Sequence, residues 1–441
     1  MNRILQPLKN KVTHSSWWNS SIAKKIIPRS EFAKNVGILS GGSTIAQGLN
    51  ILTIPIFSRL YSPKDFGIMA LFITISSIIG TISNARYDLT ILLPKKDKFA
   101  INLTFLGIVV TITISILTLI IILPFKRTFA SLFGEPAIEN FLLLLPLDIF
   151  LFGVYNSISH WCNRKKLYTV MSIEAIIHVL IIVIFRGVLY FVFPNEVGLI
   201  LSYLIGRLAS FIIMLFIGFR TMDKNILSLS IIKKLAVKYK KFPTFSTLSA
   251  FTNTLSRNIT SIMMPKVFSS KNLGYYSMSR TILGLPFSVI AVSISKIFSQ
   301  EASVEKIKTG KSIHTFDKTL KRLIIISIPL FLFIFIFVKP VITIFLGDEW
   351  IKTGEYIQFL VPLFAIQFIS SALCGIMPIY QKMKQAWVRD ILFLIASIIP
   401  ILLAHFLSLQ IETFFVLYVT SSSVAYFFSL LYYRKVTYNK T

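Results

Sequence analysis

Long uncharged runs alternate with short polar segments along almost the whole chain. Runs such as 99–125 and 323–338 contain no charged residue. A transmembrane helix needs about 20 predominantly apolar residues. The pattern predicts twelve transmembrane helices, at 37–58, 66–85, 99–124, 141–161, 167–193, 197–219, 242–265, 276–298, 322–346, 355–380, 388–408 and 412–433. We therefore expect an all-α polytopic membrane protein.

Four of the predicted helices carry polar side chains at spacings of three and four residues, which place them on one helix face. A transmembrane helix needs such a face only where polar groups or water lie against it. Ser and Thr alone would favour close helix packing, because small polar residues hydrogen-bond across helices. The stripes also contain amides, so we expect the first, second, seventh and eighth helices to line a cavity. Its candidate polar residues are Gln47, Asn50, Asn84 and Asn253.

Composition supports the membrane assignment. Of the 441 residues, 54% are hydrophobic and only 15% are charged, whereas a soluble domain carries about 25% charged residues. The two cysteines, Cys162 and Cys374, support neither a disulfide framework nor a metal site. No cofactor is expected. Residues 1–36 are basic and lack the apolar core of a signal peptide.

The net charge is +28, and the basic residues are distributed as the predicted topology requires. With the N-terminus placed inside, the interior segments hold 31 Lys and Arg residues and the exterior loops hold 7. Basic residues mark cytoplasmic loops, so both termini are expected in the cytoplasm. The basic charge sets topology and contacts the lipid bilayer, and nucleic-acid binding is not expected. The predicted organisation is 1–36 N-terminal segment, 37–219 N-lobe, 220–241 cytoplasmic linker, 242–433 C-lobe and 434–441 tail.

A short motif recurs in the two halves of the chain. Residues 59–67 (RLYSPKDFG) and 266–274 (KVFSSKNLG) share basic, aromatic, Ser, Lys, Asp/Asn, apolar and Gly positions in the same order. Many transporters contain two structural repeats with the substrate site at the repeat interface. The motif predicts two pseudo-symmetric lobes of six helices around a central cavity.

Cations inside the predicted spans outnumber carboxylates. Arg207 and Arg257 lie deepest, and Arg280 lies on the polar face of the eighth helix. A cation at the centre of a membrane helix costs about 2.5–3.5 kcal/mol, and Asp148 and Glu174 are the only carboxylates that lie away from the ends of the predicted spans. The planar guanidinium fork binds phosphate bidentately. We expect a cationic cavity for a phosphate-bearing substrate, with these arginines as its binding groups.

The buried acids have two interpretations. Glu174 and His178 are four residues apart on one predicted helix and could form a proton-linked switch. They could equally satisfy each other or a nearby arginine as structural partners. Asp148 is interpreted in the same two ways, with an ion pair favoured. All three remain candidate coupling residues.

Three N-terminal segments resemble the opening of the Wzx oligosaccharide flippases, which belong to the superfamily of multidrug, oligosaccharidyl-lipid and polysaccharide exporters. They are 43–50 (STIAQGLN), 59–67 (RLYSPKDFG) and 86–94 (RYDLTILLP), and Asn163-Arg-Lys-Lys166 is also similar. Arg86 and Asp88 match a family motif position by position, which adds Arg86 to the expected cavity cations and Asp88 to the candidate coupling residues. The C-terminal half is similar mainly in helix pattern.

The resemblance implies two six-helix lobes that alternate between inward-facing and outward-facing states. It implies transport of an undecaprenyl-pyrophosphate-linked oligosaccharide from the cytoplasmic to the periplasmic leaflet, for O-antigen or another surface polysaccharide. A polysaccharide polymerase and chain-length machinery are the partners that such a role implies. No covalent bond is broken, so the chain is not expected to be an enzyme.

Two other functions remain open. A cation-coupled exporter of another amphiphile has the same fold, but organic-cation substrates fit a net-positive cavity poorly. A membrane polymerase or glycosyltransferase usually needs a sizeable exterior loop with catalytic groups. The longest expected exterior loop, 126–140, contains only Glu135 and Glu139 as acids. The sequence contains no HExxH or GxSxG motif.

Overall fold

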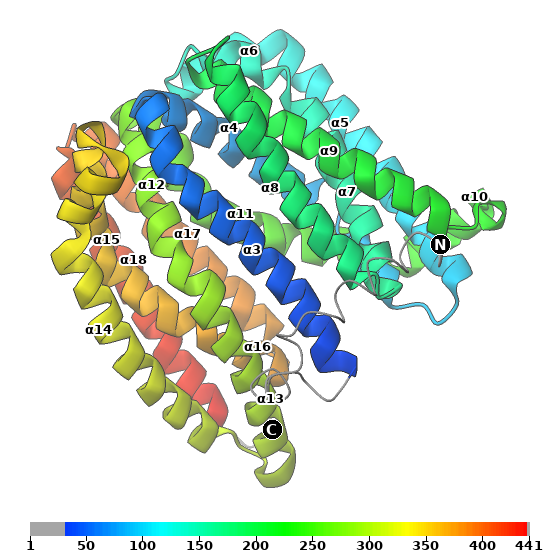
Figure 1. Cartoon of the computed structure of the whole chain (residues 1–441). Helices are drawn as coiled ribbons and strands as arrows, with labels where there is room; N and C mark the ends of the chain where they lie inside the picture. The colour runs from blue at the N-terminus through cyan, green and yellow to red at the C-terminus, as the bar shows by residue number, and fades with distance from the viewer. Residues whose placement is uncertain (1–30, 439–441) are drawn as a thin grey trace, which may run out of the picture.

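The computed structural model describes residues 31–438, and every regular element among these residues is helical (Figure 1). The expected all-α architecture is confirmed. The predicted N-terminal segment lies outside the described residues up to position 30, and its last six residues begin the first helix. Residues 439–441 of the predicted tail also lie outside them. The end of the bundle where residues 31 and 438 lie is called the terminal end, and the opposite end is called the distal end.

The first six predicted spans form one half of the bundle, here called the N-lobe (Figure 1). Its helices pack mainly on one another, for example α3 on α8, α8 on α9, and α5 on α7. Ser172 of α8 lies against Gly42 of α3 and donates a hydrogen bond of 2.8 Å to the carbonyl of Ile38. Small residues let these backbones approach closely. The elements are α3 (Glu31–Leu60), α4 (Pro63–Ile82), η2 (Tyr87–Leu92), α5 (Asp97–Phe133), α6 (Ile138–Leu142), α7 (Leu145–Arg164), α8 (Tyr168–Tyr190) and α9 (Glu196–Thr221).

The last six spans form the C-lobe, whose helices also pack largely on one another. Two of its helices contain π-helical turns, and each turn includes or follows a proline, Pro243 or Pro286. Such turns are frequent at functional sites. The elements are η4 (Phe242–Ser246), α11 (Thr247–Val267), α12 (Ser270–Pro286), η5 (Phe287–Ala291), α13 (Val292–Thr309), α14 (Ile313–Leu346), η6 (Asp348–Trp350), α15 (Ile351–Leu373), α16 (Ile376–Ile379), α17 (Met383–Phe406) and α18 (Ile411–Tyr438).

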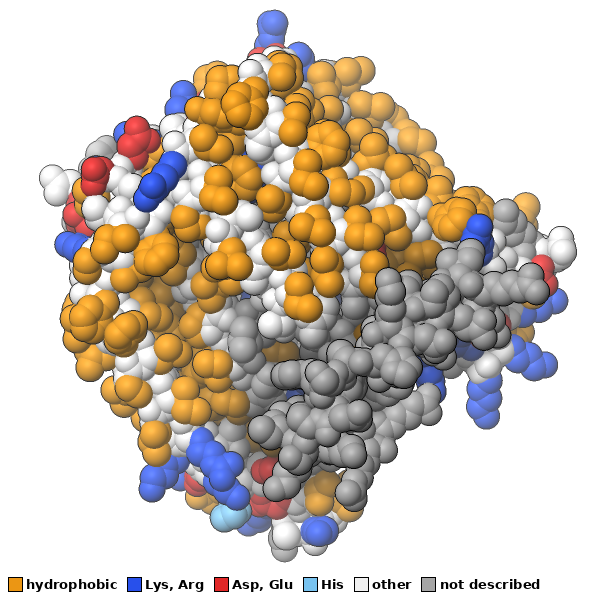
Figure 2. Space-filling model, in the orientation of Figure 1, with side chains coloured by type: hydrophobic (Ala, Val, Ile, Leu, Met, Phe, Trp, Pro, Cys, Tyr) orange, Lys and Arg blue, Asp and Glu red, His pale blue; other side chains and the backbone are white. Residues whose placement is uncertain are grey.

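Hydropathy alone identifies fewer spans than the fold contains. Within residues 31–438, nine helices are long and apolar enough to cross a membrane. The first, seventh and eighth spans, formed by α3, α11 and α12, fall short of that criterion. These three helices carry polar stripes, so their reduced apolarity agrees with a position against a cavity. Figure 2 shows the contrasting outer face, which is covered by hydrophobic side chains, with basic side chains gathered mainly beside the terminal end.

Several helices extend beyond the predicted spans. The span predicted at 99–124 lies within α5, Asp97–Phe133, and the span predicted at 322–346 lies within α14, Ile313–Leu346. Hydropathy marks only the part of a helix that matches the hydrocarbon core, whereas backbone hydrogen bonding continues into the headgroup region. The span predicted at 141–161 begins within the short α6, and a break at residues 143–144 separates that helix from α7.

The linker between the lobes contains η3 (Lys224–Ile226) and α10 (Leu229–Lys238). Leu235 of α10 is buried in a cluster with Tyr87 and Trp161 of the N-lobe. Tyr87 also donates a hydrogen bond of 3.2 Å to the carbonyl of Ala236. The linker therefore contains a short amphipathic helix that docks on the N-lobe.

The repeated motif forms the same structure twice. Ser62 is the N-cap of α4 and accepts a hydrogen bond of 3.3 Å from the backbone amide of Asp65. Ser269, at the matching position, caps α12 and accepts one of 3.1 Å from the amide of Asn272. Ser, Asp and Asn satisfy free amides at a helix start. The recurring Ser and Asp/Asn positions thus specify the starts of two corresponding helices.

The two lobes are bonded to each other at the distal end. The indole of Trp350 donates a hydrogen bond of 2.8 Å to the carbonyl of Ser58. The guanidinium of Arg59 donates one of 3.0 Å to the carbonyl of Ile344. Helices α4 and α12 also pack along each other from this end. The distal side of the interface between the lobes is therefore closed.

Candidate functional site

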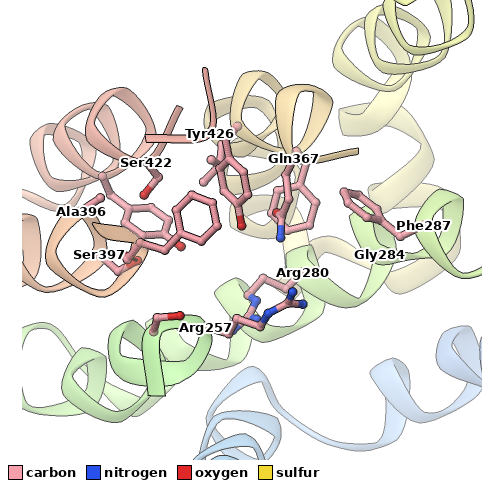
Figure 3. A pocket seen from close by; sticks show the side chains of 14 residues that line it. Arg257, Arg280, Gly284, Phe287, Gln367, Ala396, Ser397, Ser422 and Tyr426 are labelled. Carbon is pink, nitrogen blue, oxygen red and sulfur yellow. Dashed lines mark hydrogen bonds between the residues drawn. The ribbon is translucent and has the colours of Figure 1, made fainter. Parts of the chain in front are cut away.

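Two predicted cavity cations, Arg257 and Arg280, line one pocket of about 240 Å³ within the C-lobe. Figure 3 shows the two side chains next to each other, on α11 and α12, across from Gln367, Ser422 and Tyr426. The lining combines guanidinium, amide and hydroxyl groups with aromatic rings. Its residues are Ser256, Arg257, Arg280, Gly284, Phe287, Leu363, Phe364, Gln367, Phe393, Ala396, Ser397, Tyr418, Ser422 and Tyr426.

A second pocket of about 710 Å³ adjoins the first, because Arg257, Gly284 and Phe287 line both. It adds Lys296 of α13, so three cations surround the joined space. The π-helical turn η5, which begins at Phe287, separates α12 from α13 at this point. The extra residue in such a turn changes the direction of the following side chains.

The positive charge of this C-lobe site has no acidic counterpart on its walls. No Asp or Glu is among the described residues that line either pocket. Arg257 is exposed and forms no ion pair with any described residue. Arg280 donates a hydrogen bond of 3.2 Å to Ser261 Oγ, and its guanidinium lies 5.6 Å from the ring centroid of Tyr276. Both contacts hold the arginine in place without neutralising it.

A buried acidic group of the C-lobe, Asp390 of α17, already has a partner. Asp390 Oδ1 accepts a hydrogen bond of 2.7 Å from Arg389, which also donates one of 2.7 Å to the hydroxyl of Tyr433. A paired carboxylate supplies little counter-charge to its surroundings. The C-lobe site is therefore electropositive and suited to an anion such as phosphate, which arginine forks bind bidentately.

Arg207 lies elsewhere and is neutralised. Its Nε lies 3.2 Å from Asp148 Oδ1, and it also contacts the hydroxyl of Tyr203. The guanidinium packs 4.8 Å from the ring centroid of Phe152. Arg207 was expected among the cavity cations, but folding brings Asp148 of α7 against α9, and the two side chains form an ion pair. The ion-pair interpretation of Asp148 is confirmed.

A separate N-lobe pocket of about 260 Å³ brings Arg207 together with Gln47, Glu174 and His178. Glu174 is 3% exposed and accepts a hydrogen bond of 3.1 Å from Tyr155. His178 Nδ1 lies 3.0 Å from the carbonyl of Gly206 and 2.8 Å from Ser210 Oγ. Within the described residues, Glu174 and His178 form no ion pair. Each is instead held by a different neighbour.

Asn84 and Asp88 are buried rather than cavity-lining. Asn84 is 3% exposed and donates hydrogen bonds of 2.8 Å to the Gly153 carbonyl and 2.7 Å to Ser157 Oγ. Asp88 is 1% exposed and accepts one of 3.1 Å from Asn156. In contrast to the sequence-based expectation, the Asn84 amide joins the turn after α4 to α7 inside the N-lobe.

The remaining predicted residues divide between two places. Arg86 and Asn253 line a groove at the terminal end, between α4 and α11. Asn50 is exposed on α3 and does not line any of the described pockets. The twelve predicted residues thus do not form one cavity. Apart from Asn50, they lie in the C-lobe site, the N-lobe pocket, the terminal groove and the N-lobe interior.

The sequence analysis missed the wall of the C-lobe site that faces the arginines. It is formed by Gln367 of α15, Ser397 of α17, and Ser422 and Tyr426 of α18, in spans for which no polar face was predicted. Ser422 is one of four consecutive hydroxyl residues, 420–423, and Ser397 and Tyr426 stand among apolar residues, so no helical stripe stands out. The amide of Gln367 in the otherwise apolar run 359–369 is the one signal that could have indicated this wall.

Comparisons with solved structures identify the same fold. An inward-facing multidrug resistance MATE transporter of the MOP superfamily has 13% sequence identity and a TM-score of 0.70, with 90% of this chain and 94% of that chain covered. The lipid II flippase MurJ, in an inward closed conformation, has 16% identity and a TM-score of 0.68, with coverage of 90% and 86%. An outward-facing MATE transporter has 14% identity and a TM-score of 0.60, with coverage of 91% and 95%.

The similarity to these transporters confirms the expected twelve-helix, two-lobe fold. No curated protein sequence gave a significant match. A family model described as polysaccharide biosynthesis protein matches residues 56–355, which include α4 to α14 and both arginines of the C-lobe site. The chain therefore belongs to the polysaccharide biosynthesis protein family and has the fold of the MATE and MurJ structures.

Proposed function

We propose that this protein moves an undecaprenyl-pyrophosphate-linked oligosaccharide from the cytoplasmic to the periplasmic leaflet of the bacterial inner membrane. The product would supply a polymerase and its chain-length machinery for O-antigen or another surface polysaccharide. The observation that carries the proposal is the C-lobe site, where Arg257 and Arg280 face a polar pocket without a carboxylate among its described lining residues. Membership of a polysaccharide biosynthesis family supports the substrate class.

Different side chains of the C-lobe site bind different parts of the substrate. The guanidinium groups of Arg257 and Arg280 bind the pyrophosphate, because charge-assisted hydrogen bonds to an arginine fork are the strong ones. Gln367 and the hydroxyls of Ser397 and Tyr426 on the opposite wall bind sugar hydroxyls. The polyprenyl chain stays in the bilayer, since nothing in a polar pocket offsets the transfer of a long hydrocarbon chain out of lipid.

Movement of the substrate requires the lobes to rock about the site. The distal contacts of Trp350 with Ser58 and of Arg59 with Ile344 correspond to one end state, closed on the distal side. The excess of basic residues at the terminal end supports a cytoplasmic location for that end. The described state is then closed toward the periplasm and receives substrate from the cytoplasm.

The N-lobe pocket supplies the candidate coupling groups. Glu174 is almost fully buried and has Tyr155 as its hydrogen-bond donor, while Arg207 and Asp148 neutralise each other nearby. A buried carboxyl with neutral partners changes charge when it gains or loses a proton. We assign Glu174 and His178 to the coupling step, and Asp148 to holding Arg207. Asp88, buried against Asn156, belongs with the structural groups.

A gene deletion with analysis of extracted lipids tests the proposed function. Loss of the protein should cause lipid-linked repeat units to accumulate on the cytoplasmic side. Complementation with Arg257→Ala should restore little transport, whereas Arg257→Lys should restore part of it because charge is kept but the fork is lost. Arg322→Ala, which removes an exposed cation of α14, is the matched control and should restore transport fully. Full transport by Arg257→Ala would refute the assignment.

The same experiment separates the alternatives. A polymerase defect would leave single repeat units exported and attached to the surface anchor. An exporter of another amphiphile, the activity class of the MATE relatives, would leave the lipid-linked pool unchanged. The uncompensated arginines of the C-lobe site favour an anionic substrate over the organic cations considered above.

A further inference from the structure

A large groove at the terminal end has no role in the site described above. It measures about 1010 Å³ and lies between the lobes. Thr81 and Arg86 line it from the N-lobe, and parts of η4, α11 and α17 line it from the C-lobe. At its inner limit the hydroxyls of Thr81 and Thr254 lie 3.1 Å apart and join the lobes. The groove therefore ends at a hydrogen bond that separates it from the rest of the lobe interface.

One wall of the groove is apolar and exposed. Phe245 is 74% exposed, Leu248 is 52% exposed and Val388 is 51% exposed, and Met383 and Trp387 extend the same wall. Phe245 belongs to the π-helical turn η4, which precedes α11. Large apolar side chains exposed beside a pocket favour a hydrocarbon ligand. The chain contains five Trp residues, and Trp387 has the interfacial position that tryptophan prefers in membranes.

Three cations surround the same groove. Arg86, Lys241 and Lys384 line it, and the Nε of Arg86 is buried without a hydrogen-bond partner among the described residues. Asp390 is the only acid among the described lining residues, and it is paired with Arg389 at 2.7 Å. The ligand that matches an apolar wall edged by unpaired cations is an anionic amphiphile.

A polar wall connects the groove to the C-lobe site. Ser246, Ser249 and Asn253 line the groove along α11. Arg257 follows Asn253 by one helical turn on the same face, and it lines both pockets of the C-lobe site. An anionic headgroup bound at Lys241 or Lys384 can therefore pass along one face of α11 to Arg257.

We propose that this groove is the binding site for the polyprenyl phosphate end of the lipid carrier. The phosphate-bearing end contacts Arg86, Lys241 and Lys384, and the first isoprenoid units lie on Phe245, Leu248, Met383, Trp387 and Val388. The groove receives the substrate from the inner leaflet before the pyrophosphate reaches Arg257. This assignment rests on the proposed function for the identity of the lipid.

Photolabelling of the full-length protein tests the assignment. The protein is reconstituted in phosphatidylcholine nanodiscs and treated with a diazirine-bearing undecaprenyl phosphate, and the labelled peptides are identified by mass spectrometry. The label should concentrate in residues 242–248 and 383–388. Excess undecaprenyl phosphate should abolish it, and the same amount of phosphatidylglycerol should leave most of it. Equal competition by both lipids would overturn the proposal.

Charge-reversal variants distinguish binding of the lipid in the groove from its general attraction to basic residues at the membrane surface. Lys241→Glu with Lys384→Glu should reduce labelling at least about tenfold, because each lysine near an anionic lipid contributes to its binding. Lys318→Glu with Lys321→Glu makes the same charge change at exposed positions on α14 at the same end of the bundle. This control should keep labelling within about twofold. Equal loss in both double variants would show a general surface effect and overturn the proposal.

Two further variants give independent readouts. Phe245→Ser leaves the charge unchanged and should reduce labelling, and unchanged labelling would contradict the apolar wall. Arg257→Ala with Arg280→Ala should keep groove labelling while oligosaccharide transport is lost. If this variant transports normally while the groove is still labelled, the proposed C-lobe function fails and the groove assignment stands. If the groove is unlabelled in the wild-type protein, the groove assignment fails by itself.

Discussion

Gly67 of α4 and Gly274 of α12 lie against each other, and each occupies a position where a Cβ atom would collide with the other lobe. A Cβ on Gly67 would overlap the carbonyl of Ser270 and lie 3.0 Å from the amide nitrogen of Gly274. A Cβ on Gly274 would overlap the carbonyl of Pro63 and lie 3.2 Å from the amide nitrogen of Gly67. Position 63 corresponds to 270 in the repeated motif. The duplicated segment therefore packs on its own copy, and this contact closes the distal side.

This relationship predicts that Gly67→Ala opens the distal side. Forcing a methyl group into a packed backbone contact costs about 1–3 kcal/mol, and only the closed state contains that contact. Distances between spin labels placed at the distal ends of the two lobes should lengthen or broaden. Gly187→Ala is the matched control, since a Cβ on this helical glycine would meet nothing within 4 Å. Identical distance distributions for the two variants would contradict the closure.

The buried Arg207–Asp148 pair predicts a large effect on stability. Asp148→Ala leaves the guanidinium buried without its partner, and breaking a buried pair typically costs about 3–5 kcal/mol. The apparent unfolding temperature of the purified protein should fall strongly. Asp317→Ala removes the partner of Arg434 in an ion pair in which both side chains are more than 40% exposed, so it should cost at most about 1 kcal/mol. Similar losses in the two variants would show that Arg207 does not depend on Asp148.

Alanine substitutions of Asn84 and Asn253 should have opposite effects, one on the stability of the protein and the other on its affinity for the lipid carrier. Asn84→Ala removes an amide that donates to Gly153 and Ser157, and the acceptors left unpaired cost about 1–3 kcal/mol. The variant should unfold at lower temperature with unchanged affinity for the lipid carrier. Asn253→Ala, in the terminal groove, should have the opposite pattern. If Asn84→Ala reduces affinity for the lipid carrier without loss of stability, Asn84 is a binding residue, and the structural role assigned to it is wrong.

The C-lobe wall that the sequence did not indicate makes a further prediction. Gln367→Leu keeps the approximate volume of the side chain and removes its amide, which lines the pocket opposite the arginines. A lost hydrogen bond to a substrate hydroxyl typically weakens binding by about 0.5–1.5 kcal/mol. Affinity for the sugar-bearing lipid should therefore fall about two- to tenfold, while affinity for undecaprenyl pyrophosphate without sugar should stay the same. An equal fall for both ligands would contradict a sugar-binding role.

Most of the fold is predictable from the sequence because each span is a local pattern. Apolar runs indicate the helices, and Ser62 with Asp65 and Ser269 with Asn272 indicate two corresponding helix starts. Hydropathy could not give the continuation of α5 to Phe133, since those residues form helix outside the hydrocarbon core. The reciprocal packing of Gly67 and Gly274 also depends on the relative position of the two lobes, which no local pattern contains.

The site is predictable only where a residue's charge stands out from its own helix. Arg257 and Arg280 are conspicuous in polar stripes, and the structure brings them together. Arg207 is equally conspicuous, but its neutralisation by Asp148 arises from packing between α7 and α9. Asn84 continues a predicted stripe, yet α4 ends at Ile82 and the turn that follows directs the Asn84 amide toward α7. Contacts between helices thus decide which polar residues face a cavity.

The most direct test of the central claim is the affinity of the purified protein for undecaprenyl-pyrophosphate-linked oligosaccharide in nanodiscs. Loss of both Arg257 and Arg280 removes two charge-assisted contacts of about 1.5 kcal/mol or more each. The Kd of Arg257→Ala with Arg280→Ala should therefore rise about 100-fold, while that of Arg322→Ala stays within about twofold of the wild-type value. An unchanged Kd in the double variant would contradict a pyrophosphate site in the C-lobe.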